Sequence, residues 1–292
     1  MKVGWNGSII HAEEAVIPVY DHGFLYGIGL FETFRTYGGR PYLLERHLER
    51  LAEGCRELGI RCETEPDAIR AWLADVMAAN HLNEAYVRLT VTAGEAELGL
   101  PQHDYEMPNK LLLVKPLPDM SERLYREGKE LALLHTRRNT PEGPVRFKSL
   151  HYMNNILAKR ELRGIGAAAN AEGLMLTREG WLSEGIVSNL FFLKDGIVHT
   201  PSVDTGILPG ITRARVMELA STAGFRVQEG HYTWEELTGA QEVWVTNSIQ
   251  ELVSISTLRA NDGVRTQVGD GTAGPVATLL LGAYRSEAGA EG

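Results

Sequence analysis

The sequence predicts an α+β protein of two domains. Stretches with the apolar spacing of helices alternate with short runs of strand character, and both kinds occur in each half of the chain. Two prolines, Pro116 and Pro118, interrupt this pattern and mark the best candidate for a linker. We therefore expect a first domain over residues 1–117 and a larger second domain over residues 118–292.

The first half contains two predicted helices and two predicted strands. Residues 42–58 carry leucines at three- and four-residue steps and stop at Gly59, which is the pattern of an amphipathic helix. A second helix is expected over residues 66–80. Residues 85–92 alternate between apolar and other side chains, and residues 111–114 form a short apolar run, so both segments are predicted strands.

The second half is also mixed. Residues 131–135 form a predicted strand, and residues 152–163 a helix that ends at Gly164. Two hairpins follow, with turns at residues 179–180 and 195–196, where a glycine comes second in each pair. The second domain should therefore contain both a sheet and helices.

The remaining elements lead to the end of the chain. Helices are expected over residues 211–223 and from Pro275, with a capping box between Thr233 and Glu236 and a strand over residues 242–246. A GxGxxG pattern just before Pro275 is interpreted as a glycine-rich turn, because too few residues follow it for a dinucleotide-binding unit. The small, polar tail after Ser286 is expected to fray.

Composition favours small-molecule chemistry. The 292 residues carry a formal net charge of -9, which argues against a surface for nucleic acid or anionic membranes. No stretch reaches membrane-spanning length and no signal peptide is evident, so we expect a cytoplasmic protein. Cys55 and Cys62 lack metal-ligand spacing and are expected to be reduced thiols, and no metal site is predicted.

Lys148 is the candidate nucleophile. It lies close to the apolar residues Phe147 and Leu150, just before a predicted helix. Burial disfavours the charged form of an amine, and an uncharged amine can form an imine with a carbonyl group. A surface lysine whose stem packs on apolar neighbours would fit the same surroundings. The residues alone leave both interpretations open.

Three other positions have a functional and a structural interpretation. Residues 208–213 place Gly210 and Thr212 at the opening of a helix, where backbone N–H groups and the helix dipole can bind phosphate, but these residues on their own favour a plain helix start. Glu184 follows an apolar strand and could be an exposed hairpin carboxylate. Arg50 could be a solvated charge on its helix.

In their order along the chain, these positions lie in segments that resemble those of fold-type IV enzymes dependent on pyridoxal 5'-phosphate (PLP). This family includes branched-chain and D-amino-acid aminotransferases and aminodeoxychorismate lyases. The resemblance extends from about the start of the chain to residue 255 and is carried by DHGFLYGIGLFET (21–33), HLERL (47–51), KSLHYMNN (148–155), SEGIVSNLF (183–191), LPGITR (208–213) and VTNS (245–248).

The resemblance implies a cofactor, an architecture and a set of site residues. Lys148 would hold PLP as a Schiff base and move a proton, and Glu184 would contact the pyridine nitrogen. The remaining contacts would come from Arg50, Ile211, Thr212 and Ser248 at the cofactor phosphate and from Tyr152 at the ring oxygen. The implied architecture is a small α/β domain and a larger pseudobarrel-like domain, with the site in the cleft between them, in a homodimer.

Within the family, three further segments resemble the aminodeoxychorismate lyases, which form 4-aminobenzoate and pyruvate for folate synthesis: residues 22–29, 138–143 and 201–208. A difference from the D-amino-acid aminotransferases points to the same conclusion. D-amino-acid aminotransferases have an arginine and a histidine in a loop that binds the substrate carboxylate, whereas residues 92–100 here contain two glutamates and no basic residue. The resemblance therefore implies a lyase acting on a small molecule.

Three other functions remain open. An aminotransferase for D- or branched-chain amino acids would share every cofactor residue. The chain could also be a non-catalytic protein that binds PLP or another metabolite, or a lysine Schiff-base lyase without a cofactor. The candidates for binding the substrate carboxylates are Arg137, Arg138 and His151.

Overall fold

The computed structural model describes residues 1–291 and divides the chain into two compact units. The first unit contains Met1–Pro118, Phe147–His151 and the end of the chain from Ala288, and the second contains Asp119–Arg146 and Tyr152–Glu287. The chain thus leaves the first unit directly after Pro118. It returns for the five residues that include Lys148, which the sequence-based range of the first domain did not contain.

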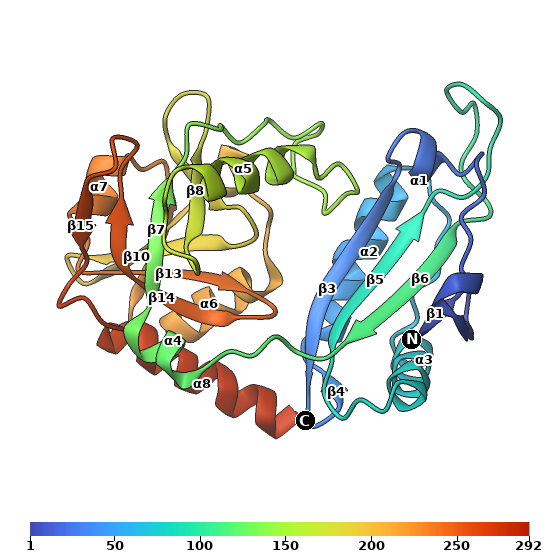
Figure 1. The fold of residues 1–292 in the computed structure, drawn as a ribbon, viewed down its shortest axis with the longest axis horizontal. Helices are drawn as coiled ribbons and strands as arrows, with labels where there is room; N and C mark the ends of the chain where they lie inside the picture. Colours follow the sequence, from blue (N-terminus) through green and yellow to red (C-terminus); the bar gives the residue numbers. More distant parts are fainter. Residues whose placement is uncertain (292) are drawn as a thin grey trace. The chain divides into compact units, whose positions relative to one another are not determined.

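The first unit is built on an antiparallel sheet of six strands in the order β2-β1-β6-β5-β3-β4. Figure 1 shows its three long strands β3, β5 and β6 as neighbours. The strands are β1 (Lys2–Trp5), β2 (Ser8–His11), β3 (Gly29–Tyr37), β4 (Arg40–Pro41), β5 (Tyr86–Thr92) and β6 (Asn109–Lys115).

Two helices cover one face of this sheet. In α2 (Leu44–Glu57) and α3 (Pro66–Ala79), the apolar side chains pack in one core with alternate residues of the long strands, such as Leu30 and Phe34 of β3. Because successive strand residues point to opposite faces, Phe31 lies on the other face of the sheet. The short elements η1 (Ala12–Glu14) and α1 (His22–Leu25) precede β3.

The second unit contains a nine-stranded mixed sheet in the order β12-β11-β10-β13-β14-β7-β8-β9, with β15 paired to β14. Strand β9 also packs near β10 and β11, so the sheet curls toward closure. The strands are β7 (Lys129–Leu133), β8 (Glu172–Leu176), β9 (Leu182–Gly185), β10 (Asn189–Lys194), β11 (Ile197–Pro201), β12 (Arg226–Gly230), β13 (Glu242–Asn247), β14 (Glu251–Arg259) and β15 (Arg265–Gln267).

Side chains of the curled sheet alternate between two cores. Leu131 and Leu133 of β7 belong to one cluster, and Ala132 belongs to another that includes residues of helix α5. The helices of this unit are α4 (Glu122–Glu127), α5 (Met153–Gly164), η2 (Val203–Thr205), α6 (Ile211–Thr222), α7 (Trp234–Thr238) and α8 (Pro275–Glu291). Helix α7 begins with the predicted capping box at Thr233.

The α+β prediction is confirmed, whereas the predicted fraying of the tail after Ser286 is wrong for residues 287–291; Gly292 lies outside the described residues. Helix α8 continues through Glu291. The reason is tertiary, because Arg215 binds the carboxylate of Glu287 through two guanidinium nitrogens and Ala288 is 1% exposed. Small residues that look like a polar tail in the sequence therefore continue a packed helix.

Helix α8 is also anchored at its start. Glu242 at the beginning of β13 is buried, and its two carboxylate oxygens accept hydrogen bonds from the backbone N–H groups of Val276 and Ala277, each at 3.0 Å. These N–H groups have no partner inside the helix, because they belong to its first turn. A side chain from a distant strand thus takes the place of a local capping residue.

We expect Glu242→Ala to lower the free energy of unfolding by about 1–3 kcal/mol, because two buried N–H groups lose their acceptors. Calorimetry of thermal unfolding measures the change. The matched control is Glu235→Ala, an exposed glutamate of α7, which should change the free energy by no more than about 0.5 kcal/mol. Equal effects of the two substitutions would contradict the capping role.

Candidate active site

Lys148 is held at an edge of the first sheet by its backbone. The carbonyl oxygen of Lys148 accepts a hydrogen bond from the N–H of Phe31 at 2.9 Å, and the N–H of Leu150 donates to the carbonyl oxygen of Gly29 at 3.0 Å. These bonds pair the segment with the start of β3, on the edge that faces away from β5; β4 pairs with the end of β3. The position of the lysine is therefore fixed independently of its side chain.

The side chain of Lys148 lies over an aromatic ring together with a second cation. Its Nζ atom is 4.5 Å from the centroid of the Phe31 ring, and the guanidinium carbon of Arg88 is 3.6 Å from the same centroid. Lys148 is half-buried, as a catalytic lysine and a lysine with a packed stem would both be, so its role as nucleophile stays a prediction. Sequence analysis missed Arg88, because an arginine in an alternating strand is expected to face solvent.

A buried carboxylate lies on the helix-covered face of the same strand. Glu32 is 1% exposed and accepts hydrogen bonds from Nε and Nη2 of Arg50, at 2.9 and 2.7 Å. It also lies 2.6 Å from Nδ1 of His47. Arg50 is thus not a solvated helix charge, since its side chain is only 15% exposed and pairs with a buried acid.

The protonation states in this cluster follow from burial and charge. Burial by itself raises the pKa of the Glu32 carboxyl, but the charges and hydrogen bonds of Arg50 and His47 outweigh it and lower that pKa to about 2. Burial, together with the charges of Arg50 and Lys148, lowers the pKa of His47 from its usual value, although Glu32 raises it. Because Glu32 is ionised and cannot donate, neutral His47 must carry its proton on Nδ1 and donate it.

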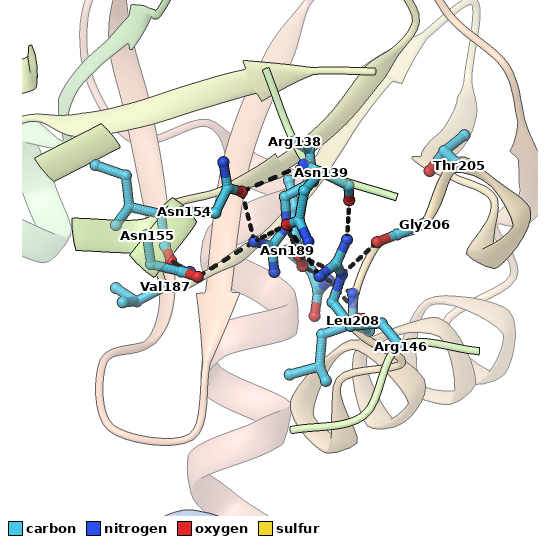
Figure 2. A network of polar contacts seen from close by, with 12 residues as sticks. Arg138, Asn139, Arg146, Asn154, Asn155, Val187, Asn189, Thr205, Gly206 and Leu208 are labelled. Carbon is cyan, nitrogen blue, oxygen red and sulfur yellow. Dashed lines mark hydrogen bonds and ion pairs between the residues drawn. The ribbon is translucent and has the colours of Figure 1, made fainter. Parts of the chain in front are cut away.

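Glu184 lies near the end of β9 in the second unit and is 4% exposed, so it is not an exposed hairpin residue. Its carboxylate accepts hydrogen bonds from Nε of Arg138 at 2.8 Å, from Nδ2 of Asn189 at 3.3 Å and from the N–H of Leu208 at 3.0 Å. Figure 2 shows the polar network that these residues share with Arg146, whose Nε lies 3.9 Å from Glu184. The carboxylate is held by partners from three segments of the chain.

Arg138 was a candidate for binding the substrate carboxylates, and that role stays a prediction, because the structure shows its guanidinium bound to residues of the protein. Nη1 of its buried guanidinium donates to the side-chain oxygens of Asn154 at 2.8 Å and Asn155 at 3.2 Å, while Nε is bound to Glu184 (Figure 2). Its charge balances Glu184 inside the protein. The other two candidates, Arg137 and His151, are exposed, and His151 Nε2 lies 3.1 Å from the carbonyl oxygen of Tyr26.

Arg146 adds a second positive charge near Glu184. Burial, together with the charge of Arg138, lowers its pKa to about 10, so it remains protonated near neutral pH. Its Nε donates to the carbonyl oxygen of Gly206 at 2.6 Å. Sequence analysis did not single out Arg146 or Asn189, because nothing in the local pattern separates them from surface residues.

The opening of α6 has the donor set of a phosphate site. Its N-cap residue is Gly210, which supplies no capping side chain, and the hydroxyls of Thr212 and Ser248 lie 3.1 Å apart beside the first turn. A Cβ atom at Gly210 would lie 2.0 Å from Oδ1 of Asn189, so only glycine fits there. Backbone N–H groups, two hydroxyls and the positive end of a 12-residue helix suit a bound anion.

The predicted site residues are thus divided between the units. Lys148 and Arg50 belong to the first, and the second contains the other five: Tyr152, Glu184, Ile211, Thr212 and Ser248. Tyr152 is the half-buried N-cap residue of α5, four residues after Lys148, and its contact with the ring oxygen stays a prediction. The chain passes between the units on either side of Phe147–His151.

The loop after β5 carries the acidic residues noted in the sequence. Glu95 and Glu97 are both exposed. The carbonyl oxygen of Glu97 lies 2.9 Å from Nε2 of buried His22, whose Nδ1 lies 2.9 Å from the hydroxyl of Tyr105. Within residues 1–291, no helix is long and apolar enough to cross a membrane, and no group of histidine, cysteine and acidic residues could hold a metal ion.

The chain is similar to several known proteins in sequence and in structure. Aminodeoxychorismate lyase of Bacillus subtilis is 42% identical over 255 residues, which are 87% of this chain and 85% of that protein. The structure of 4-amino-4-deoxychorismate lyase from Pseudomonas aeruginosa is similar with a TM-score of 0.83 at 31% identity, covering 98% of this chain and 99% of that one. Branched-chain amino acid aminotransferase of Escherichia coli matches with a TM-score of 0.86 at 26% identity, over 98% and 93% of the two chains.

A family model described as amino-transferase class IV matches residues 29–258, which extend from the first residue of β3 almost to the end of β14. The match includes all seven predicted site residues. The chain therefore belongs to the amino-transferase class IV family, as its motifs predicted.

Proposed function

We propose that this protein is a PLP-dependent 4-amino-4-deoxychorismate lyase that forms 4-aminobenzoate and pyruvate. The observation that carries the proposal is the 42% identity to the Bacillus subtilis lyase along most of both chains. Relatives described as branched-chain or D-alanine aminotransferases are 28–32% identical. They support an aminotransferase only as an alternative with the same fold.

The chemistry of the donor groups fits PLP. The hydroxyls of Thr212 and Ser248 and the N–H groups of Ile211 and Thr212 would bind the cofactor phosphate, and Arg50 would add a positive charge. Glu184, held by Arg138, would contact the pyridine nitrogen. One amine, one buried acid and one anion site are the groups that this cofactor needs.

Bound PLP supplies an aromatic ring that withdraws electrons from the substrate carbon attached to the reacting nitrogen. Lys148 holds the cofactor, yields its place to the substrate amine and removes the proton from the amine-bearing carbon. Glu184 keeps a proton at the pyridine nitrogen. Lys148 would then give that proton to the departing enolpyruvyl group as the product ring becomes aromatic. Finally, its amine would displace 4-aminobenzoate and hold the cofactor again.

The loop after β5 supports lysis over transamination. A transaminase must hold an α-carboxylate close to the reacting carbon, usually with a charged or bidentate donor. Here the exposed Glu95 and Glu97 would repel such a group, and Arg138 is bound to Glu184. The lyase substrate presents its carboxylates farther from the reacting carbon and does not need a cation in this loop.

We further infer a cytoplasmic homodimer. The two cysteines form no disulfide, which favours a reducing compartment. Cell fractionation that recovers the protein elsewhere would refute the cytoplasmic location.

The homodimer is inferred from an exposed apolar surface of the first unit. Four side chains there are more than two-thirds exposed: Phe24 of α1, and Leu98, Leu100 and Met107 of the loop after β5. The loop and α1 are joined by hydrogen bonds, such as that from the N–H of Gly99 to the hydroxyl of Tyr26. Such an apolar surface favours a second copy of the chain.

Purified protein given aminodeoxychorismate should release pyruvate much faster than it forms glutamate from 2-oxoglutarate with D-alanine or L-leucine. A coupled assay measures each product. Lys148→Ala is the control and should abolish pyruvate release, because the amine that holds the cofactor and moves the proton is gone. Rapid glutamate formation without pyruvate release would assign the protein to the aminotransferases instead.

Glu184→Gln should slow pyruvate release on the order of a hundredfold, since a neutral amide does not hold a proton on the pyridine nitrogen. PLP affinity should fall far less, because the phosphate contacts are intact. Single-turnover kinetics and cofactor titration separate the two effects. Glu235→Gln, on the exposed face of α7, is the control expected to change neither. Near-normal turnover in Glu184→Gln would exclude this role.

The wild-type protein should sediment as a species of twice the 32.3 kDa chain mass. Phe24→Glu combined with Leu100→Glu should shift it toward the single-chain mass, because both side chains would place charge in a buried apolar interface. Leu279→Glu changes a 52% exposed leucine of α8 and should leave the mass unchanged. A monomeric wild type, or a dimer insensitive to the double substitution, would overturn the inference.

A further inference from the structure

We propose that Glu32 is a positioning residue that orients the guanidinium of Arg50 toward the phosphate of PLP. The inference rests on the proposed function, in which Arg50 contacts that phosphate. It assigns a task to a buried acid that touches neither cofactor nor substrate in the mechanism above. The sequence analysis gave Glu32 no role, although it lies in the segment DHGFLYGIGLFET.

The geometry of the pair determines where Arg50 can point. Glu32 binds Arg50 side-on, through Nε and Nη2, with one carboxylate oxygen on each nitrogen. Because a guanidinium is planar and rigid, this pairing directs the third nitrogen, Nη1, away from Glu32. An arginine held in this way has already lost its rotamer freedom when the protein folds. Binding of the anion then costs less conformational entropy, so the affinity is higher.

Glu32 is itself held in place by two residues of helix α2. Glu32 is on β3, while His47 and Arg50 are three residues apart on α2 and therefore share one face of that helix. His47 donates its Nδ1 proton to the oxygen that also accepts from Nη2 of Arg50. The charge of Glu32 persists at any physiological pH, since its pKa is about 2. The cluster thus keeps one orientation of the arginine under all working conditions.

A purely structural ion pair predicts something different. If Glu32 only fastened α2 to the sheet, its loss would weaken the site as a whole, and every form of the cofactor would bind less tightly. If Glu32 acts through Arg50, only a ligand with a phosphate should be affected. PLP has a phosphate and pyridoxal does not, so the affinities of a variant for these two ligands distinguish the two roles.

The test is a titration of cofactor-free protein with PLP and with pyridoxal, followed by the absorbance of the bound ligand. Glu32→Gln should bind PLP on the order of tenfold more weakly than wild type, because the amide gives Arg50 one acceptor and no charge. Its affinity for pyridoxal should stay within about threefold. Glu49→Gln, an exposed residue of α2, is the matched control and should change neither affinity.

A double-substitution cycle identifies the partner. Arg50→Ala should weaken PLP binding more than Glu32→Gln does, and adding Glu32→Gln to it should weaken binding no further. If Glu32→Gln does not fold, Glu32→Asp takes its place. Aspartate keeps the charge but has a side chain shorter by one methylene, so its affinity for PLP should fall less than that of Glu32→Gln, and its affinity for pyridoxal should not change. Equal losses for PLP and pyridoxal, or additive losses in the cycle, would overturn the proposal.

These outcomes are independent of the reaction. Wild-type protein that binds PLP but releases no pyruvate from aminodeoxychorismate would refute the proposed lyase and leave the role of Glu32 intact. Conversely, normal PLP binding by Arg50→Ala would refute the role of Glu32 and leave the lyase intact.

Discussion

Two main-chain hydrogen bonds at the edge of β3 hold Lys148 in place, and the surroundings of its amine depend on them. The lysine comes from the middle of the chain, between two long segments of the second unit. Pairing with Gly29 and Phe31 inserts it into the first sheet, over the Phe31 ring and across the strand from Glu32. Since backbone groups make these bonds, they hold the residue in place without using its side-chain amine.

Each unit also contains a buried carboxylate bound to an arginine. Glu32 is held by Arg50 and Glu184 by Arg138, with hydrogen bonds from neutral groups completing both sets. An unpaired charge in such places would be costly, so each acid requires its arginine, and removal of one partner leaves the other uncompensated. The consequence for function is rigidity, because neither carboxylate can turn without breaking several hydrogen bonds at once.

Local patterns in the sequence were sufficient for most of the secondary structure. The leucine spacing before Gly59 corresponds to α2, and the glycine-containing turn at residues 195–196 to the hairpin of β10 and β11. Strand β3 was not predicted, because a strand that is buried on both faces and carries Glu32 lacks the alternation that marks half-buried strands. The end of α8 was mispredicted for a related reason, since Glu287 is bound by Arg215, a residue far away in the sequence.

The sequence by itself determined the order of the motifs, the negative net charge and the identity of the residues with reactive groups, because these are properties of the linear chain and do not depend on its fold. It also assigned the family, since Lys148, Glu184 and the opening of α6 occur in a recognisable sequence. Only the tertiary structure decided that Arg50 and Arg138 are paired with buried acids and that Arg88 lies beside Lys148 over Phe31. Burial and ion pairing depend on contacts between residues far apart in the chain, 18 positions for Glu32 and Arg50 and 46 for Arg138 and Glu184, and no local pattern records them.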